Sequence, residues 1–331
     1  MLKRFFLVAI VFLSLFSCDN KVDLNDEYQE ITIVYGLLNT NDNQHFVKII
    51  KAFQSEGNVY ISSIDPKNSE FSIPREVWMD EYVNGTKTRT ISLDTLTINN
   101  KDSGIFYYPT QLVYATAPNT KLIENAEYKL FVKNTQTGKI ISSTTQTISP
   151  VSFTKPSSTS QSASFTGLTQ KIEWDSPSHG KMYQVKIRFF YHSNDAGVIS
   201  NGMVEKFIGE FRSNTDNGVQ TCVIEFVNST FFENLSLHIP VAKFGETRYF
   251  DSIQYILDVA NEDFTVYMDI NKPSESIVQE RPAYTNIEGG LGIFASRCSK
   301  TNRYTKLTKP AMDSLILGQY TKNLGFVEVV K

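Results

Sequence analysis

Runs of strand-forming residues joined by glycine-containing turns constrain the fold of this chain more than any other feature. The run Glu76–Val83 is followed by Asn84-Gly85 and then by a second run, Thr86–Leu93. An Asn-Gly dipeptide between two such runs favours a two-residue β-hairpin, because both turn positions need a positive φ. The sequence therefore predicts antiparallel pairing between these two runs.

Other segments have the same character. Gly138 separates the runs Tyr128–Val132 and Lys139–Ile148 and suits the left-handed position of a second hairpin turn. The stretch Tyr183–Phe189 alternates apolar and polar residues, which is typical of a strand with one buried face. Beside it we expect Trp174 to anchor the core from an adjacent strand. Further strands are predicted at Ile31–Tyr35, His45–Lys51, Ile172–Asp175, Thr221–Val227 and Gln254–Val259.

Two short helices interrupt this pattern near the C-terminus. Asn261 is suited to cap a helix over Glu262–Asn271, whose first acidic residues favour the positive helix end. A second helix is predicted from Pro310 to Leu317, with Gly318 just past its end. Helix is therefore a minor component of the expected fold.

The predicted fold class is mostly β, with tandem immunoglobulin-like or fibronectin-like β-sandwich domains and minor short helices. The Cys-Trp-Cys core of a true antibody domain is absent, so only the architecture is inferred. We expect a first sandwich domain at 28–149 and a second, sandwich-like domain at 171–331. The Ser- and Thr-rich stretch between them, residues 150–170, reads as an inter-domain linker with little to bury.

The N-terminus is typical of a bacterial lipoprotein signal. Lys3-Arg4 precedes an apolar run that ends in Leu15-Phe16-Ser17-Cys18. This run is shorter than the about 20 residues that a membrane span needs. We expect residues 1–17 to be a signal peptide and Cys18 to be lipidated. A cleaved secretory peptide is the alternative, although Leu15 and Phe16 fit its small-residue cut site poorly.

The acidic stretch at residues 18–27 has little to pack into a core. It reads as a flexible tether between lipid and body, or as an export tag of the kind that surface lipoproteins of Bacteroidota carry. The expected location is therefore the outer membrane, lipid-anchored, with the body at the cell surface or on the periplasmic face.

Composition excludes several partners. The net charge is −3 and no basic stripe is visible, so a nucleic-acid partner is not expected. None of the 4 histidines has metal-ligand spacing with another His or Cys, so we expect no metal. Nucleophile-elbow, phosphate-loop and dinucleotide motifs are also missing, and no cofactor is predicted.

Beyond the lipidation site, Cys222 and Cys298 either form a disulfide or are separate buried thiols.

Four other segments are candidates for chemistry or binding. Glu173 and Asp175 flank Trp174 and would share one strand face, as a glycosidase pair or simply as the solvated side of the strand. The segment Asn39–Asn43 is either a weak calcium loop or a polar turn. The glycine-rich string Asn286–Phe294 is either a bulged strand entering the core or a loop shaped to meet a partner. Three tyrosines are candidates for stacking on a ligand, or are ordinary strand residues: Tyr107, Tyr108 and Tyr114.

A family resemblance rests on two of these regions. Residues Ile33–Asn39, followed by His45–Ile49 and Ala52-Phe53, resemble the opening of a Bacteroidota outer-membrane lipoprotein family described only as a domain of unknown function. The string Asn286–Phe294 is similar to the closing motif of that family. Members are typically encoded beside TonB-dependent outer-membrane receptors. The resemblance implies an accessory lipoprotein at such a barrel and carries over no catalytic residue.

We therefore expect a non-enzymatic binding protein with two partners, a TonB-dependent receptor and a polysaccharide or peptide ligand, whose binding residues the sequence does not identify. A surface glycosidase or peptidase is one alternative. A structural or adhesive envelope lipoprotein is another.

Overall fold

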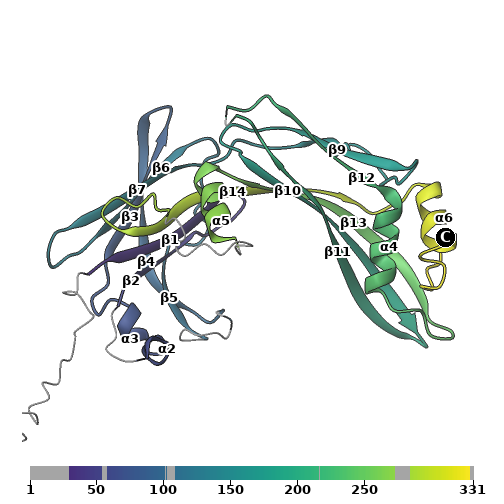
Figure 1. The fold of residues 1–331 in the computed structure, drawn as a ribbon, viewed down its shortest axis with the longest axis horizontal. Coiled ribbons are helices and arrows are strands. Elements are labelled where there is room, and N and C mark those ends of the chain that lie inside the picture. Colours follow the sequence, from purple (N-terminus) through teal and green to yellow (C-terminus); the bar gives the residue numbers. More distant parts are fainter. Residues whose placement is uncertain are drawn as a thin grey trace, which may run out of the picture.

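The structure is a computed structural model that describes residues 30–53, 58–100, 102, 109–215, 217–272 and 284–328. It is mostly β, with a few short helices (Figure 1). The strands are β1 (Thr32–Asn39), β2 (Phe46–Lys51), β3 (Glu76–Val83), β4 (Thr86–Ile98), β5 (Gln111–Ala115), β6 (Glu127–Lys133), β7 (Ile140–Gln146), β8 (Phe153–Lys155), β9 (Thr169–Asp175), β10 (Met182–Asp195), β11 (Val198–Arg212), β12 (Thr221–Val227), β13 (Thr247–Ala260) and β14 (Leu291–Tyr304). The helices are α2 (Val59–Ser62), α3 (Pro66–Ser69), α4 (Asn228–His238), α5 (Glu262–Asn271) and α6 (Lys309–Leu317).

A single mixed sheet runs through most of the molecule. Its strand order is β11-β10-β13-β14-β1-β2-β5-β4-β3-β6-β7, and a smaller sheet has the order β12-β9-β8. The predicted class, mostly β with sandwich-type packing and short helices, is confirmed. The predicted hairpin turn between β3 and β4 also forms, with φ of 50° at Asn84 and 77° at Gly85.

The first unit consists of β1–β7 and the first half of β14. Its strands curl around a core in which alternate side chains meet, because each strand buries every second residue. Members of this core include Val34, Leu38, Met79, Tyr128, Leu130 and Phe294.

The second unit consists of β8–β13, the second half of β14, α4 and α6. Its core lies between the small sheet and the strands β10, β11 and β13. Trp174 is fully buried there, with its ring centroid 5.4 Å from that of Tyr183. The strands that carry these two residues were predicted to be adjacent. They face each other from different sheets, since β9 pairs with β8 and β12.

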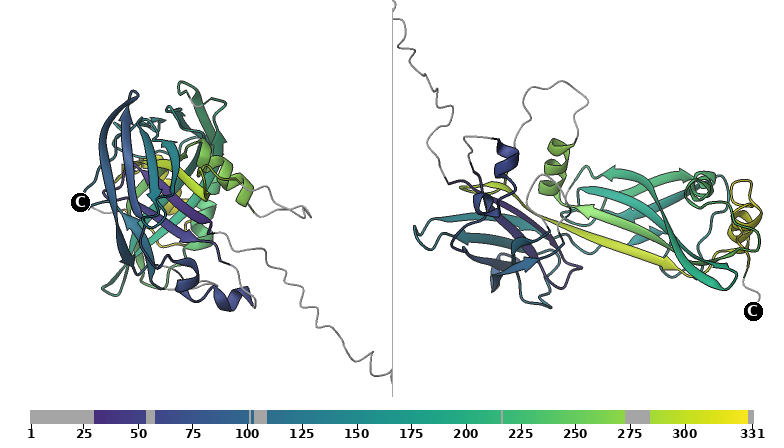
Figure 2. Two further views of the ribbon diagram at one scale, coloured as in Figure 1. Left: turned by 90° about the vertical axis from the view of Figure 1, so that its left-hand side faces the viewer. Right: turned by 90° about the horizontal axis from the view of Figure 1, so that it is seen from below.

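Strand β14 joins the two units. Residues Leu291–Arg297 pair with β1 in parallel, and Arg297–Tyr304 pair with β13 antiparallel. Ile287 and Phe294 therefore belong to the first core, although the predicted boundary assigned every residue after 171 to the second domain. Figure 2 shows α5 at this junction, where Asn261 donates a hydrogen bond to Thr145 Oγ1 at 3.0 Å.

The predicted linker at 150–170 is partly built into the second unit. Four apolar side chains from this stretch are buried in the second core: Val151, Phe153, Ala163 and Phe165. The polar segment between them is held at its start by Asn302 and Tyr304, which donate to the carbonyls of Pro156 and Ser157. The burial of these spaced apolar residues thus holds the stretch against the second core, although its composition is rich in Ser and Thr.

Both predicted helices are present. Asn261 caps α5 by accepting from the backbone N–H of Phe264 at 3.1 Å, and α6 ends at Gly318 as expected. The sequence analysis missed α4, which begins without a side-chain cap after Val227. Tertiary packing stabilises it, because Phe231, Phe232 and Leu235 are buried against the second core.

Candidate ligand-binding groove

The outer face of β4, β3, β6 and β7 carries the candidate site. On β3, Val77 and Met79 point into the core, so Trp78 between them points outward. The register places Ser92 of β4 on one side of Trp78 and Phe131 of β6 on the other. An aromatic pair therefore stands on the solvent side of the sheet, beside a strand with small polar side chains.

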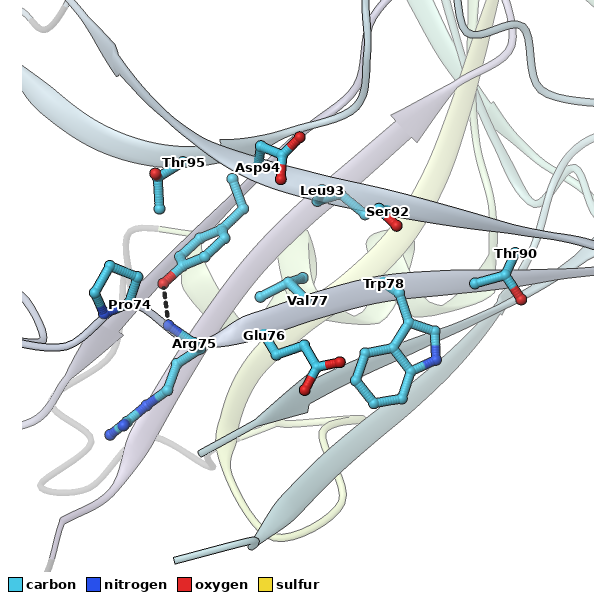
Figure 3. A pocket seen from close by; sticks show the side chains of 11 residues that line it. Pro74, Arg75, Glu76, Val77, Trp78, Thr90, Ser92, Leu93, Asp94 and Thr95 are labelled. Carbon is cyan, nitrogen blue, oxygen red and sulfur yellow. Dashed lines mark hydrogen bonds between the residues drawn. The ribbon is translucent and has the colours of Figure 1, made fainter. Parts of the chain in front are cut away.

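Trp78 and Phe131 stack with their ring centroids 5.2 Å apart and an interplanar angle of 18°. Phe131 covers one side of the indole. Ser92 is the cross-strand neighbour of Trp78 on β4, and Thr90 lies two residues from Ser92; both are exposed. Figure 3 shows the indole beside the Glu76 carboxylate, with these β4 side chains on the neighbouring strand. This arrangement leaves a flat aromatic wall next to polar groups.

A groove of about 510 Å³ runs along this wall. It lies where β4 changes partner, since Leu93 still pairs with β3 and Asp94 already pairs with β5. Below it, the hydroxyl of Tyr114 accepts from the backbone N–H of Arg75 at 2.7 Å. We call this the Trp78 groove; it is lined by Pro74, Arg75, Glu76, Val77, Trp78, Thr90, Ser92, Leu93, Asp94, Thr95 and Tyr114.

Two of the three charged side chains that line the groove are paired with neighbours, whereas Asp94 has no ion-pair partner among the described residues. Lys133 lies 2.8 Å from Glu76, and the buried guanidinium of Arg75 lies 2.6 Å from Glu30. The groove therefore combines an aromatic wall, hydroxyl groups, two paired charges and the carboxylate of Asp94. This is the kind of lining that binds a polar organic ligand with an apolar face, such as a sugar ring.

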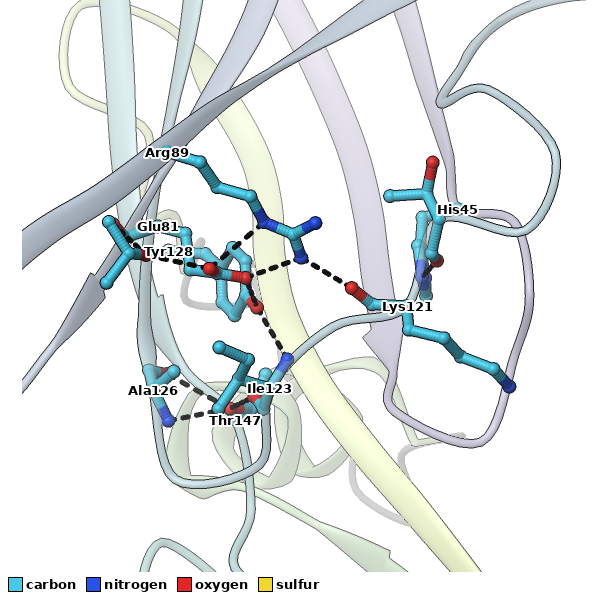
Figure 4. Close-up of polar contacts among 10 residues, drawn as sticks. His45, Glu81, Arg89, Lys121, Ile123, Ala126, Tyr128 and Thr147 are labelled. Atoms are coloured by element: carbon cyan, nitrogen blue, oxygen red, sulfur yellow. Dashed lines mark hydrogen bonds and ion pairs between the residues drawn. The ribbon is translucent and has the colours of Figure 1, made fainter.

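A buried polar cluster supports the inner side of the same strands (Figure 4). Glu81 is 1% exposed and pairs with Arg89 at 2.7 Å, while the hydroxyls of Tyr128 and Thr88 also donate to its carboxylate. Burial alone would raise the pKa of Glu81, but these hydrogen bonds outweigh it and the pKa is lowered from 4.5. The pKa of Tyr128 is raised by burial and by Glu81. Glu81 is therefore ionised and Tyr128 neutral, and both are hydrogen-bonded to other side chains of the cluster. We interpret the cluster as one that stabilises the fold.

The two candidate carboxylates that flank Trp174 are each engaged by a neighbouring side chain. Glu173 forms an ion pair with Lys155 at 3.0 Å, and Asp175 accepts from Thr221 at 3.1 Å. Both lie on the solvent side of β9, with Trp174 fully buried between them. The structure therefore matches the interpretation of a solvated strand face.

Cys222 and Cys298 are both free and buried, so the disulfide alternative is wrong. In the strand register, Cys222 lies opposite Trp174 in the small sheet, whereas Cys298 lies opposite Val259 in the large sheet. Burial, with smaller contributions from neighbouring carboxylates, raises the pKa of the two thiols to about 11 and about 12. At neutral pH both are therefore protonated and poor nucleophiles.

The Asn39–Asn43 segment is a polar turn. Asn39 uses its side chain to accept from Asn41 N at 3.1 Å and to donate to Asp42 Oδ1 at 3.2 Å. The side-chain oxygens of Asn39 and Asp42 are thus engaged within the turn, and Asn41 Oδ1 accepts from the backbone N–H of Ser299 at 2.8 Å. Throughout the described ranges, no three His, Cys, Asp or Glu residues gather in a way that could hold a metal ion.

The glycine-rich string is part of the fold. The amide of Asn286 bonds the backbone N–H and C=O of Phe294 at 2.9 and 2.8 Å, which closes the loop on itself. Ile287, Ile293 and Phe294 are buried. The string thus leads into a strand that enters the core, as predicted, although the pairings of β14 with β1 and β13 contain no bulge.

The remaining predicted residues divide in two groups. Tyr114 is 2% exposed, and its hydroxyl forms the floor of the groove. Cys18, Tyr107 and Tyr108 lie outside the described residues, as do the signal peptide and the tether. In the part of the chain that is described, no helix has the length and hydropathy that crossing a bilayer requires.

The sequence analysis did not single out Trp78 or Phe131. A usable signal was present, because Val77 and Met79 mark the buried face of β3 and place Trp78 on the opposite one. The partnership with Phe131 was hidden, since it depends on the register between β3 and β6.

Comparisons with known proteins add little. No protein-family model and no curated protein matches the chain. Among solved structures, the C-terminal globular domain of an oligosaccharyltransferase from Pyrococcus abyssi matches over 84% of this chain and 50% of that one, at 10% identity and a TM-score of 0.22. The chain thus spans about half the length of that structure. A TM-score this low carries no argument about fold or function.

Proposed function

We propose that this chain is a non-enzymatic, lipid-anchored binding protein of the outer membrane that captures a polysaccharide for a TonB-dependent import receptor. The lipidation signal ending at Cys18 and the resemblance to a Bacteroidota lipoprotein family support the location and the receptor partner. The Trp78 groove supports the ligand class.

The observation that carries the proposal is the aromatic wall of the groove. A pyranose ring has an apolar face of C–H groups and a rim of hydroxyls. The indole of Trp78 offers a flat partner for the apolar face, and the exposed residues Ser92 and Asp94 offer hydrogen bonds to the rim. Thr90 can only accept there, because its hydroxyl donates to Asp80 at 2.7 Å. The groove lies open on a sheet surface, which suits a section of a long chain better than a small, enclosed metabolite.

The enzymatic alternative has weaker support. Its residues Glu173 and Asp175 are engaged by Lys155 and Thr221, on a different sheet from the groove. The groove does contain two carboxylates, Glu76 and Asp94, and the ammonium of Lys133 neutralises the first. We therefore assign these carboxylates to ligand binding.

The test is a binding panel of soluble polysaccharides measured by affinity electrophoresis and calorimetry. We expect Trp78→Ala to weaken binding of the best ligand about tenfold or more, which corresponds to about 1.4 kcal/mol. Trp78→Phe should restore part of the affinity, because it returns a ring. Leu237→Ala, a change to an exposed residue of α4, is the matched control. Binding that is indifferent to Trp78→Ala, or release of shortened sugars on incubation, would contradict the proposal.

The receptor partner needs a separate test. We expect a mild-detergent pull-down of the full chain from its native membrane to recover a TonB-dependent barrel in stoichiometric amount. Recovery of this chain alone would argue against the import role and favour a freestanding binding or adhesive protein.

A further inference from the structure

Four large apolar side chains project into solvent between β2 and β3. Val59, Tyr60, Ile61 and Ile64 are 57%, 65%, 71% and 57% exposed, and α2 has no buried residue at all. We call these four residues the apolar knuckle. Such a concentration of exposed apolar residues within six positions marks a contact surface.

The knuckle is a built element in which side chains cap both short helices. Asn58 caps α2 through the N–H of Tyr60 at 2.9 Å, and Asp65 caps α3 through the N–H of Lys67 at 3.0 Å. Asn68 donates to the carbonyl of Ser62 at 2.8 Å and ties the two turns together. Because these bonds use up backbone groups of the segment, it can enter an apolar phase at a low cost in lost hydrogen bonds.

The knuckle lies beside the point where the described chain begins. Glu30 forms an ion pair with Arg75 at 2.6 Å, and the guanidinium of Arg75 lies 3.8 Å from the ring centre of Phe71. Figures 1 and 2 show α2 and α3 close to the start of β1. Cys18 precedes Glu30 by twelve residues, a chain that reaches at most about 40 Å.

We propose that the apolar knuckle inserts into the lipid bilayer surface next to the Cys18 anchor and so fixes the orientation of the body on the membrane. This inference rests on the lipid anchor of the proposed function. The short tether keeps the knuckle at high local concentration near the lipid, so a contact too weak to hold the protein by itself still forms. Tyr60 suits the depth of the head groups, and Ile61 and Ile64 suit the acyl boundary.

The opposite end of the molecule provides a matched control. Leu237 on α4 is 75% exposed, similar to Ile61, but α4 lies far from α2 and α3 (Figure 1). Exposure alone therefore predicts the same behaviour for both positions. Orientation by the tether predicts lipid contact at Ile61 and none at Leu237.

The experiment uses the body from residue 19 onward, which keeps every described strand and helix, with a hexahistidine at its N-terminus in place of the lipid. It is tethered to phosphatidylcholine vesicles that contain a nickel-chelating lipid. An environment-sensitive fluorophore is attached at Ile61→Cys or at Leu237→Cys. The native Cys222 and Cys298 are 0% and 7% exposed, so they stay unlabelled.

On tethering, we expect the emission at position 61 to shift to the blue and to rise several-fold, with no change at position 237. Emission at position 61 that stays as in solution would overturn the proposal. The same rise without vesicles, growing with protein concentration, would also overturn it and identify a second copy of the chain as the occupant.

A second pair of variants provides an independent readout. At a limiting density of the nickel-chelating lipid, we expect Tyr60→Ser combined with Ile61→Ser to lower vesicle flotation of the tethered body several-fold. Leu237→Ser should leave this flotation unchanged, and equal flotation of the two variants would contradict the proposal. Polysaccharide binding should persist in both. Because the artificial tether replaces the lipid, a negative result here contradicts only the membrane contact. Loss of fatty-acid labelling in Cys18→Ser of the full chain tests the anchor itself.

Discussion

Glu81 shows how a single residue can be polar, buried and structural in this fold. It is an acid on the inward side of β3, where the neighbouring core residues are apolar. The guanidinium of Arg89 and the hydroxyls of Tyr128 and Thr88 donate hydrogen bonds to its carboxylate. The negative charge is therefore stabilised although it is buried. Removing any one partner leaves a buried charge with fewer hydrogen bonds, which is costly.

This residue predicts a specific pH dependence of stability. Because the folded pKa of Glu81 lies below 4.5, its ionised form stabilises the fold above that value, and the contribution is lost as pH falls through the folded pKa. We expect the free energy of unfolding to decline below about pH 4.5. Glu81→Gln should lower stability by about 2 kcal/mol at pH 7 and remove this part of the decline.

Denaturant titrations at a series of pH values give this measurement. The control is Glu76→Gln, a change to an exposed carboxylate on the same strand, which should retain the wild-type profile. If the free energy of unfolding of Glu81→Gln fell with pH in parallel with that of the wild type, protonation of Glu81 would not contribute to acid unfolding.

At the scale of elements, the parallel pair β1–β14 depends on close backbone approach. Gly292 has a φ of +106°, and a Cβ built on it would lie 2.0 Å from the carbonyl oxygen of Val34. Gly36 on β1 lies against the ring of Phe294, where a Cβ would come within 2.7 Å. Gly292 thus allows the close approach of the β14 backbone to β1, and Gly36 leaves room for the ring of Phe294.

We therefore expect Gly292→Ala to lower the free energy of unfolding by about 3 kcal/mol or more, from backbone strain and overpacking together. The matched control is Gly197→Ala, at a hairpin tip with a φ of +90° and nothing within 4 Å. It carries only the backbone strain and should cost about 1 kcal/mol. Thermal and chemical denaturation measure both, and equal losses would show that the contact with Val34 is easily relieved.

At the scale of the whole molecule, β14 makes the two units interdependent. Its first half pairs in parallel with β1 and brings Phe294 into the first core, and its second half pairs with β13. The first unit is therefore assembled from segments nearly 140 residues apart in sequence, since β7 ends at Gln146 and Asn286 begins the returning segment. A boundary drawn along the chain cannot separate the two cores.

The fragment 28–149, which the sequence suggests as a domain, should consequently fail to fold cooperatively alone. It lacks Ile287, Phe294 and β14, the parallel partner of β1, although the antiparallel partner β2 is present. The same fragment joined by a flexible glycine-serine linker to residues 284–304 should fold. Circular dichroism melts and amide NMR spectra compare the two, and a sharp melt of 28–149 by itself would refute the interdependence.

Much of the local structure followed from the sequence. The β3–β4 hairpin, the strand at β10 and the capped helix α5 were predictable, because turn geometry, residue alternation and helix capping act between residues close in the chain. Of the candidate site, only the outward direction of Trp78 was readable in this way. The stacked Phe131 and the change of pairing partner of β4 at Asp94 depend on pairing between distant strands.

By itself, then, the sequence determined a mostly β chain with short capped helices, because these features depend on local backbone preferences and on alternating burial. Only the tertiary structure decided that one sheet passes through both cores, that Cys222 and Cys298 lie in different sheets as free thiols, and that Trp78 forms the wall of a groove. Those outcomes depend on strand order and register, which are set when distant apolar faces are buried together.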